Sequence, residues 1–241
     1  MRIASAIWVM ALLATMASTQ AHAASSYNTS YKKHEYPVIG GGRAPNHRLA
    51  IAAHGEGDDG YDNFHLYLMR DHQIIQSLPA IESKDILDTA PKDYDAAWSP
   101  DSRRVIVTYR RDRHSLELRL YDVRGRQVRR IPMPDPVERF IEQSKDDPQN
   151  LRARNISISW LSPTRFRLKQ QSVYVMPSRE LANALGPLGR AEVDPQTQTT
   201  DSDGKPVTWF RVNASLNVVY DVRNGSHPQI ISMKPGDFDD L

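Results

Sequence analysis

An internal repeat limits the possible folds of this chain more than any other feature. The eight residues from Pro45 align with the eight from Pro100 at an offset of 55, and both segments have a proline-led polar turn followed by an apolar strand. Further along, residues 66–70 align with residues 120–124 at an offset of 54. Because two landmarks recur in the same order at nearly the same separation, the sequence predicts a repeated supersecondary unit.

A third copy of this unit is split. A Trp-Leu-Ser-Pro turn at 160–163 resembles the Trp-Ser-Pro turn at 98–100, and the sequence Tyr-Asp-Val-Arg at 121–124 recurs at 220–223. Residues 176–207 lie between the two halves of the third copy. We therefore expect three related units, the last of which contains an insertion.

Each unit has the residue pattern of β-strands. Residues 105–109 are β-branched and aromatic, which is typical of a buried strand. Apolar and polar residues alternate over 116–121, the period of a half-buried strand. Residues 127–131 are charged, as in an outer strand protected against edge pairing.

Two short helices are expected in the connections. The first begins with Asp135 as the capping residue and Pro136 in the first turn, and its apolar face contains Val137, Phe140 and Ile141. The second is capped by Ser178 and ends at Gly186, and its apolar face contains Leu181, Leu185 and Leu188.

The N-terminus has the pattern of an export signal. Arg2 precedes an apolar run at residues 3–17, and Ala21-His22-Ala23 supplies a small-x-small cleavage site. The run is shorter than the roughly 20 residues that cross a bilayer, so we favour cleavage over a permanent anchor. We predict a signal peptide at 1–23 and a single domain at 24–241, without a transmembrane anchor and located in the periplasm or secreted.

Composition narrows the classes of partner. The chain has no cysteine, which excludes disulfides, thiolate metal sites and a lipidated cysteine. The formal net charge of +2 becomes +1 when Arg2 is removed with the signal, so bulk charge indicates no particular partner. Arginines are concentrated over residues 103–130 but alternate with core residues and lack an aromatic stacking platform. We expect no nucleic acid; an anionic membrane surface or envelope polymer fits these arginines better.

The second unit resembles a known repeat. Residues 97–106, followed by Leu-Tyr-Asp-Val at 120–123, are similar to the WD-like repeat of TolB-type periplasmic β-propellers, in which W-S-P-D-G-x-x-I precedes L-Y-x-x-D. Ser102 stands where the family usually has glycine, and Asp122 lies one place early. The likeness covers about half of the mature chain. Residues 50–101 are also similar to a group of exported bacterial proteins, a likeness that implies no activity.

The resemblance implies an all-β fold, a propeller-like array of about three four-stranded blades with the two short helices in connections. It implies a protein-binding surface rather than an enzyme. Propellers usually have at least four blades. A fourth blade could form from residues 27–42 with the C-terminus, the array could be open, or another chain could complete it as an oligomer.

The strongest candidate site is the loop from His54 to His65. It contains four carboxylates, glycines that permit tight folding, and a histidine at each end. Oxygen-rich clusters suit Ca²⁺, and histidines with carboxylates suit a transition metal. No other cofactor is expected. The spacing matches no EF-hand or zinc signature, and a solvated acidic hairpin loop is the simpler interpretation. The carboxylates are Glu56, Asp58, Asp59 and Asp62, and the candidate metal ligands are His54, Asp58, Asp59, Asp62 and His65.

The corresponding loop of the second unit is basic. It contains Arg110, Arg111, Arg113 and His114. If the units are blades, this basic loop and the acidic loop emerge at the same end of the domain. They could pair with one another, or form a two-sided polar surface for another envelope or secreted protein. Trp98 and Trp160 occupy equivalent positions, so we expect both to pack within the blades and not to serve as ligand platforms.

These observations predict a non-catalytic binding module of propeller-like repeats that works outside the cytoplasm. The alternative is a metal-dependent hydrolase or lyase with its centre in the loop from His54 to His65. A third hypothesis is a structural envelope protein that makes its contacts through the charged outer strands. The chain has no G-x-S-x-G nucleophile elbow.

Overall fold

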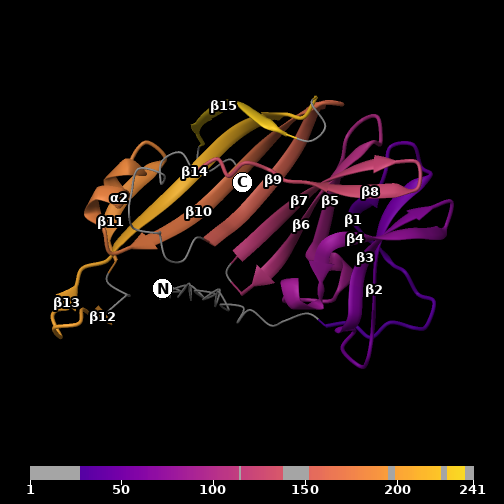
Figure 1. Ribbon diagram of the computed structural model, residues 1–241, viewed down its shortest axis with the longest axis horizontal. Coiled ribbons are helices and arrows are strands. Elements are labelled where there is room, and N and C mark those ends of the chain that lie inside the picture. Colours follow the sequence, from indigo (N-terminus) through magenta and orange to yellow (C-terminus); the bar gives the residue numbers. More distant parts are fainter. Residues whose placement is uncertain (1–27, 114, 138–151, 195–198, 224–226, 237–241) are drawn as a thin grey trace, which may run out of the picture.

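The computed structural model describes residues 28–113, 115–137, 152–194, 199–223 and 227–236 (Figure 1). These residues form an all-β protein, as the sequence predicts. The largest element is an eight-stranded sheet with the order β4-β3-β2-β1-β5-β6-β7-β8. Its strands are β1 (Val38–Arg43), β2 (Leu49–Glu56), β3 (Asp62–Arg70), β4 (Gln73–Glu82), β5 (Tyr94–Trp98), β6 (Arg104–Asp112), β7 (Ser115–Arg124) and β8 (Gln127–Ile131).

The eight-stranded sheet consists of two four-stranded meanders, one for each of the first two predicted units. Strands β1–β4 form an antiparallel first meander and β5–β8 an antiparallel second meander. The meanders join through parallel pairing of β1 with β5, where Gly40 lies opposite Asp95. At the other margin, the side chain of Gln76 exchanges two hydrogen bonds with the main chain of Val128. The first two units therefore form one nearly closed sheet and not two separate sheets.

A five-stranded sheet contains the third unit. Its long strands are β9 (Arg152–Ser162), β10 (Arg165–Met176) and β14 (Phe210–Asp221). Strand β14 pairs with β11 (Gly189–Val193) along one half and with β15 (Gln229–Pro235) along the other. Neither β1 nor β15 starts a fourth unit, because each pairs within a sheet already described. The short strands β12 (Thr199–Thr200) and β13 (Pro206–Val207) pair with each other.

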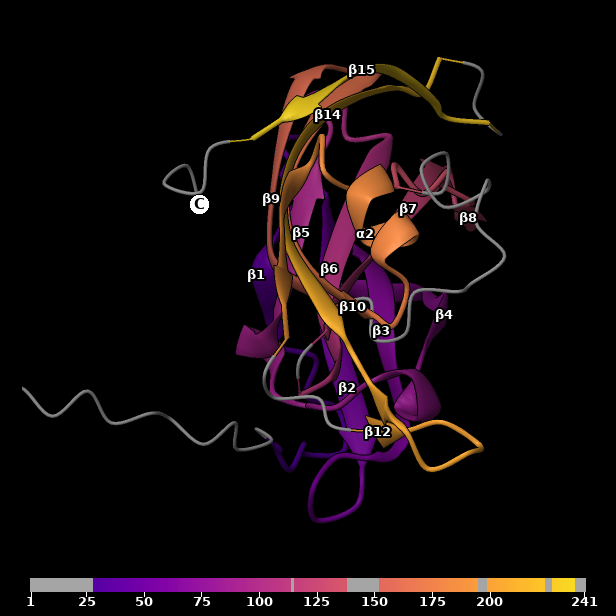
Figure 2. The same ribbon diagram turned by 90° about the vertical axis from the view of Figure 1, so that its left-hand side faces the viewer.

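The helices lie in connections. Helix α2 (Arg179–Ala184) begins where expected, and the side chain of Ser178 accepts a hydrogen bond from the main-chain N–H of Leu181. Its buried residues pack on the concave side of the five-stranded sheet (Figure 2). The first predicted helix lies largely outside the described residues. The connection between β4 and β5 contains two single-turn 3₁₀ helices, η1 (Ser83–Asp85) and η2 (Pro91–Asp93). No helix in the described segments is long and apolar enough to span a bilayer.

Two hydrophobic cores hold the layers together, because β6 and β7 have apolar residues on both faces. Val105 and Val107 of β6 pack with the first meander, whereas Ile106 between them packs with the five-stranded sheet. This is the period-two alternation of a strand that is covered on both sides. The second meander is therefore the central layer.

The second and third units are each hydrogen-bonded to the preceding unit through a tryptophan. The indole N–H of Trp98 donates to the carbonyl of Gly42 at 2.8 Å, and that of Trp160 donates to the carbonyl of Ala97 at 2.9 Å. Gly42 and Ala97 are equivalent residues, since they are related by the same offset of 55 that relates Pro45 to Pro100. Both tryptophans pack against a hydrophobic core, as expected, and both also make this hydrogen bond to the preceding unit.

The repeated Tyr-Asp-Val-Arg sequence forms an ion cluster in each of its two copies. Asp122 accepts a hydrogen bond from Arg124 at 2.7 Å and lies 4.0 Å from Arg104, its partner across β6 and β7. Asp221 accepts hydrogen bonds from Arg223 and, at 3.1 Å, from its cross-strand partner Arg165.

We expect Trp98→Phe to lower the free energy of unfolding by about 2 kcal/mol, because it removes the donor to a buried carbonyl. Urea denaturation followed by circular dichroism measures this difference. Trp209→Phe is the matched control: its indole donates to the exposed hydroxyl of Thr199, which water can satisfy. Equal losses in the two variants would contradict a special role for the bond between units.

We expect Asp221→Asn to lower stability at pH 7 and to have a smaller effect near pH 3. The hydrogen bond from Arg223, with that from Arg165, holds the pKa of Asp221 well below its usual range despite burial. The ionised carboxylate therefore stabilises the fold above its unfolded-state pKa of about 3.9, and this stabilisation falls as the pH drops below that value. Urea midpoints at both pH values measure the effect. The exposed Asp203 provides Asp203→Asn as the control, and a pH-independent loss in Asp221→Asn would disprove the assignment.

Candidate functional site

The acidic and basic loops emerge at the same end of the eight-stranded sheet. Strands β1 and β5 are parallel, and β2 and β6 run antiparallel to them, so β2 and β6 end at the same side. The acidic loop follows β2 and the basic loop follows β6. The topology therefore brings together the two loops that the sequence analysis paired.

The acidic loop is folded tightly by its own backbone. Gly57 and Gly60 have positive φ values of 81° and 69°, a region that residues with a Cβ avoid. The carboxylate of Asp59 accepts a hydrogen bond from the main-chain N–H of Tyr61 at 3.0 Å. Glu56 accepts one from the side chain of Asn63 at 2.9 Å. Two of the four carboxylates thus have defined partners within the loop.

The two histidines of this loop lie opposite each other across β2 and β3. His54 is only 8% exposed and contacts the carbonyl of Glu35 through Nδ1 at 2.8 Å. Its ring stacks on Tyr36 with 4.4 Å between centroids. His65 has a buried Nδ1 without a hydrogen-bond partner in the part of the chain that the structure describes. His54 is therefore part of an aromatic cluster that attaches the segment before β1 to the first meander.

The candidate metal ligands do not gather into a metal-sized cluster. In the described ranges, no three His, Asp or Glu side chains lie close enough together to hold an ion. Glu56 and Asp62 are cross-strand partners at the base of the loop, and the main-chain carbonyl of Asp58 accepts a hydrogen bond from the hydroxyl of Ser30. The geometry of the loop favours no particular metal.

The basic loop is held by carboxylates of its own hairpin and of the preceding connection. Arg111 binds Glu117 at 2.7 Å, and Arg119 also contacts this carboxylate. Burial raises the pKa of Glu117, but the hydrogen bond from Arg111 and the charges of both arginines outweigh burial and bring it below its ordinary value. Arg110 lies 3.7 Å from Asp88, whose side chain is 1% exposed. Arg113 is exposed at the tip, and His114 lies outside the described residues.

The connection between β4 and β5 joins the two loops. Residues 86–89 accept hydrogen bonds from three tyrosine hydroxyls: Tyr61 donates to the carbonyl of Leu87, Tyr31 to that of Thr89, and Tyr94 to that of Asp88. The hydroxyl of Thr89 donates to the carbonyl of Asp59 at 2.7 Å, on the acidic loop. We call residues 86–89 the bridge segment.

The bridge segment also binds the basic loop. The main-chain N–H of Leu87 donates to the carbonyl of Arg110 at 3.0 Å. Nearby, burial and the charge of Asp88 raise the pKa of Asp93 above its ordinary value. Sequence reasoning missed this segment because most of its hydrogen-bonding groups belong to the main chain, which has no residue signature. The only signal was the set of tyrosines around it.

Comparison with known proteins identifies no relative: no family model, no curated protein and no solved structure matches this chain.

We expect Gly60→Ala to destabilise the protein more than Gly204→Ala. Both glycines have positive φ, so each substitution costs about 1 kcal/mol in backbone strain. A Cβ at Gly60 would lie 2.3 Å from the carbonyl of Thr29, whereas a Cβ at Gly204 would meet nothing within 4 Å. The overlap adds about 1–3 kcal/mol for Gly60→Ala, measurable by urea denaturation. Equal effects would mean that the acidic loop is not packed on the N-terminal segment.

Proposed function

We propose that this chain is an exported, non-catalytic binding module of propeller-like repeats that acts in the periplasm or as a secreted protein. Its partner is another envelope or secreted protein, which binds the acidic and basic loops together. The observation that carries the proposal is that both loops are hydrogen-bonded to the bridge segment. Two oppositely charged loops on one ordered support offer a partner a surface that needs little ordering on binding.

The charges of this surface suit recognition of a protein. No ion pair between the acidic and basic loops is found in the part of the chain that the structure describes. The exposed loop residues Asp58 and Arg113 therefore present charges of opposite sign to solvent at the same end of the sheet. Complementary charges at a rim mainly accelerate association and discriminate between partners. The expected ligand is a protein whose surface has a basic patch opposite the acidic loop and an acidic patch opposite the basic loop.

The propeller-like interpretation rests on the relation between successive units. The inner strands of the first two units run parallel, and Trp98 and Trp160 make equivalent hydrogen bonds to the preceding unit. The central layer is covered on both faces by its neighbours, as a blade is within a propeller. The fold differs from a propeller of separate blades in one respect: the first two units pair with each other in one nearly closed sheet.

Site-specific photo-crosslinking tests the proposed surface. The crosslinking residue replaces Asp58 or Arg113 in the full chain, expressed in its native host. Controls carry it at Arg130 on the outer strand β8 or at Ser157 on the exposed face of β9. We expect Asp58 and Arg113 to capture the same exported protein. N-terminal sequencing of the binding module itself, purified from the same cells, should begin at Ala24.

Each other outcome has a defined meaning. Capture at Arg130 alone would favour a structural envelope protein that uses its outer strands, and capture at no position would contradict the binding module. A thermal shift of several degrees with Ca²⁺ or Zn²⁺ would favour the metal-dependent hydrolase or lyase. Under the proposed function, neither ion changes the melting temperature.

A further inference from the structure

A cavity lies at the end of the eight-stranded sheet away from the two loops. It has a volume of about 690 Å³, is open to solvent on one side, and is lined by turns of all three units. Asn46 represents the turn before β2, Ser102 the turn before β6, and Thr164 the turn before β10. The main-chain N–H of Asn46 donates to the hydroxyl of Ser102 at 3.0 Å, which connects the first two turns. This space belongs to the junction of the repeats and not to the proposed protein-binding surface.

Arginine dominates the wall of this cavity. Four guanidinium groups and two carboxylates line it: Arg70, Arg103, Arg104, Arg124, Asp101 and Asp122. Both carboxylates have partners in the wall. Asp122 accepts from Arg124 at 2.7 Å, and Asp101 accepts from the hydroxyl of Ser99 at 2.6 Å and from the main-chain N–H of Arg103 at 3.2 Å. The cavity therefore has more cationic groups than its own acids neutralise.

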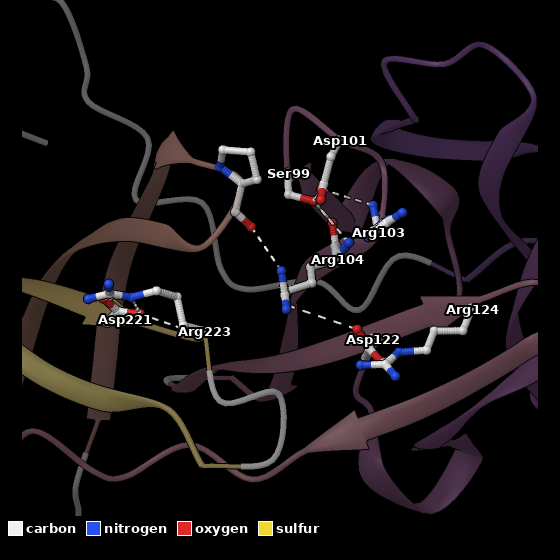
Figure 3. A network of polar contacts seen from close by, with 9 residues as sticks. Ser99, Asp101, Arg103, Arg104, Asp122, Arg124, Asp221 and Arg223 are labelled. Atoms are coloured by element: carbon white, nitrogen blue, oxygen red, sulfur yellow. Dashed lines mark hydrogen bonds and ion pairs between the residues drawn. The ribbon is translucent and has the colours of Figure 1, made fainter.

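Arg104 is the deepest of these cations. It is 8% exposed, and its Nη1 donates to the carbonyl of Pro163 at 3.0 Å, which fixes the guanidinium between the second and third units. Its Nε is buried and lies 4.0 Å from the carboxylate of Asp122, but it has no hydrogen-bond partner among the described residues (Figure 3). A buried cation is costly unless its charge and its donors are satisfied. An anion in the adjoining cavity would lower that cost.

Arg103 and Arg70 lie at the rim. For Arg103, the contacts found in the described part of the chain are made by its main-chain N–H and carbonyl, so its guanidinium group is available to a ligand. Arg70 donates to the carbonyl of Gly125 across the cavity rim, from the first unit to the second. The planar guanidinium group binds carboxylate and phosphate oxygens through two parallel hydrogen bonds.

We propose that this arginine cavity binds a small polar molecule that carries a phosphate or carboxylate group. The anionic group lies near Arg104, and Arg103 and Arg70 contact it from the rim. The volume falls within the roughly 300–1,000 Å³ typical of small-molecule sites. The ligand is of the size of a sugar phosphate or a sugar acid. The proposal does not depend on the protein partner, because the cavity and the loops lie at opposite ends of the sheet.

Isothermal titration calorimetry on the purified mature protein tests the proposal. The probes are glucose 6-phosphate, glucuronate, inorganic phosphate and neutral glucose, at constant ionic strength. We expect an anionic probe to bind and glucose to give no signal. Arg103→Gln and Arg70→Gln should each weaken binding by about tenfold or more, the effect of losing one charge-assisted hydrogen bond. Both are preferred to Arg104→Gln, which removes a buried contact between units.

Arg190→Gln is the matched control. Arg190 is exposed on β11, away from the cavity, and its substitution removes the same charge as Arg103→Gln. It should leave the affinity unchanged. Tighter binding of glucose 6-phosphate than of inorganic phosphate would assign a sugar phosphate, equal binding would assign the inorganic ion, and preference for glucuronate would assign a carboxylate. Absence of binding by every anion, or equal weakening in Arg190→Gln and Arg103→Gln, would overturn the proposal.

Discussion

The hydrogen bond from an indole N–H to a carbonyl of the preceding unit determines how the layers of this protein are stacked. Trp98 makes it to Gly42 and Trp160 makes it to Ala97, in each case at the strand that begins a unit. A buried carbonyl without a donor is costly, so each tryptophan fixes the position of its unit against the previous one. The strand turns that form the arginine cavity come after these positions in the chain. The geometry of that cavity therefore follows from the stacking.

The stack has different surfaces at its two ends. The outer face of the first meander is covered by the segment before β1, whose Tyr36 stacks on the ring of His54. The outer face of the five-stranded sheet exposes polar side chains, including Asn155, Ser157 and Ser159. Capping of this kind is what a short repeat array needs to remain separate from further copies. Both terminal faces are compatible with a stack of three units.

The strand pattern made the all-β class predictable, but not the joining of the first two units into one nearly closed sheet. Offsets of 54 and 55 identified the meanders, and the turn residues identified their boundaries. The parallel pairing of Gly40 with Asp95 was not predictable, because no local pattern encodes which distant strands become neighbours. The acidic loop was predicted to be tightly folded. The hydrogen bonds that orient it involve the carbonyl of Leu87, which any residue could supply, and the hydroxyl of Thr89, which lies far from the loop in the sequence. Similarly, the arginines of residues 103–130 were visible in the sequence, whereas their meeting with Arg70 depends on the stacking of the two meanders.

The pairing of β10 with β14 is continuous over twelve residues, from Arg165 opposite Asp221 to Met176 opposite Phe210. The ion cluster of Asp221 lies at one end of this ribbon and the inserted segment leaves from the other. Chain length at the tip of such a ribbon is independent of the register at its base. The third unit can therefore carry a segment of variable length there while the register at its base stays the same. The tip of the ribbon is therefore where the outer shape of the protein can change, and the base is where the strand register is fixed.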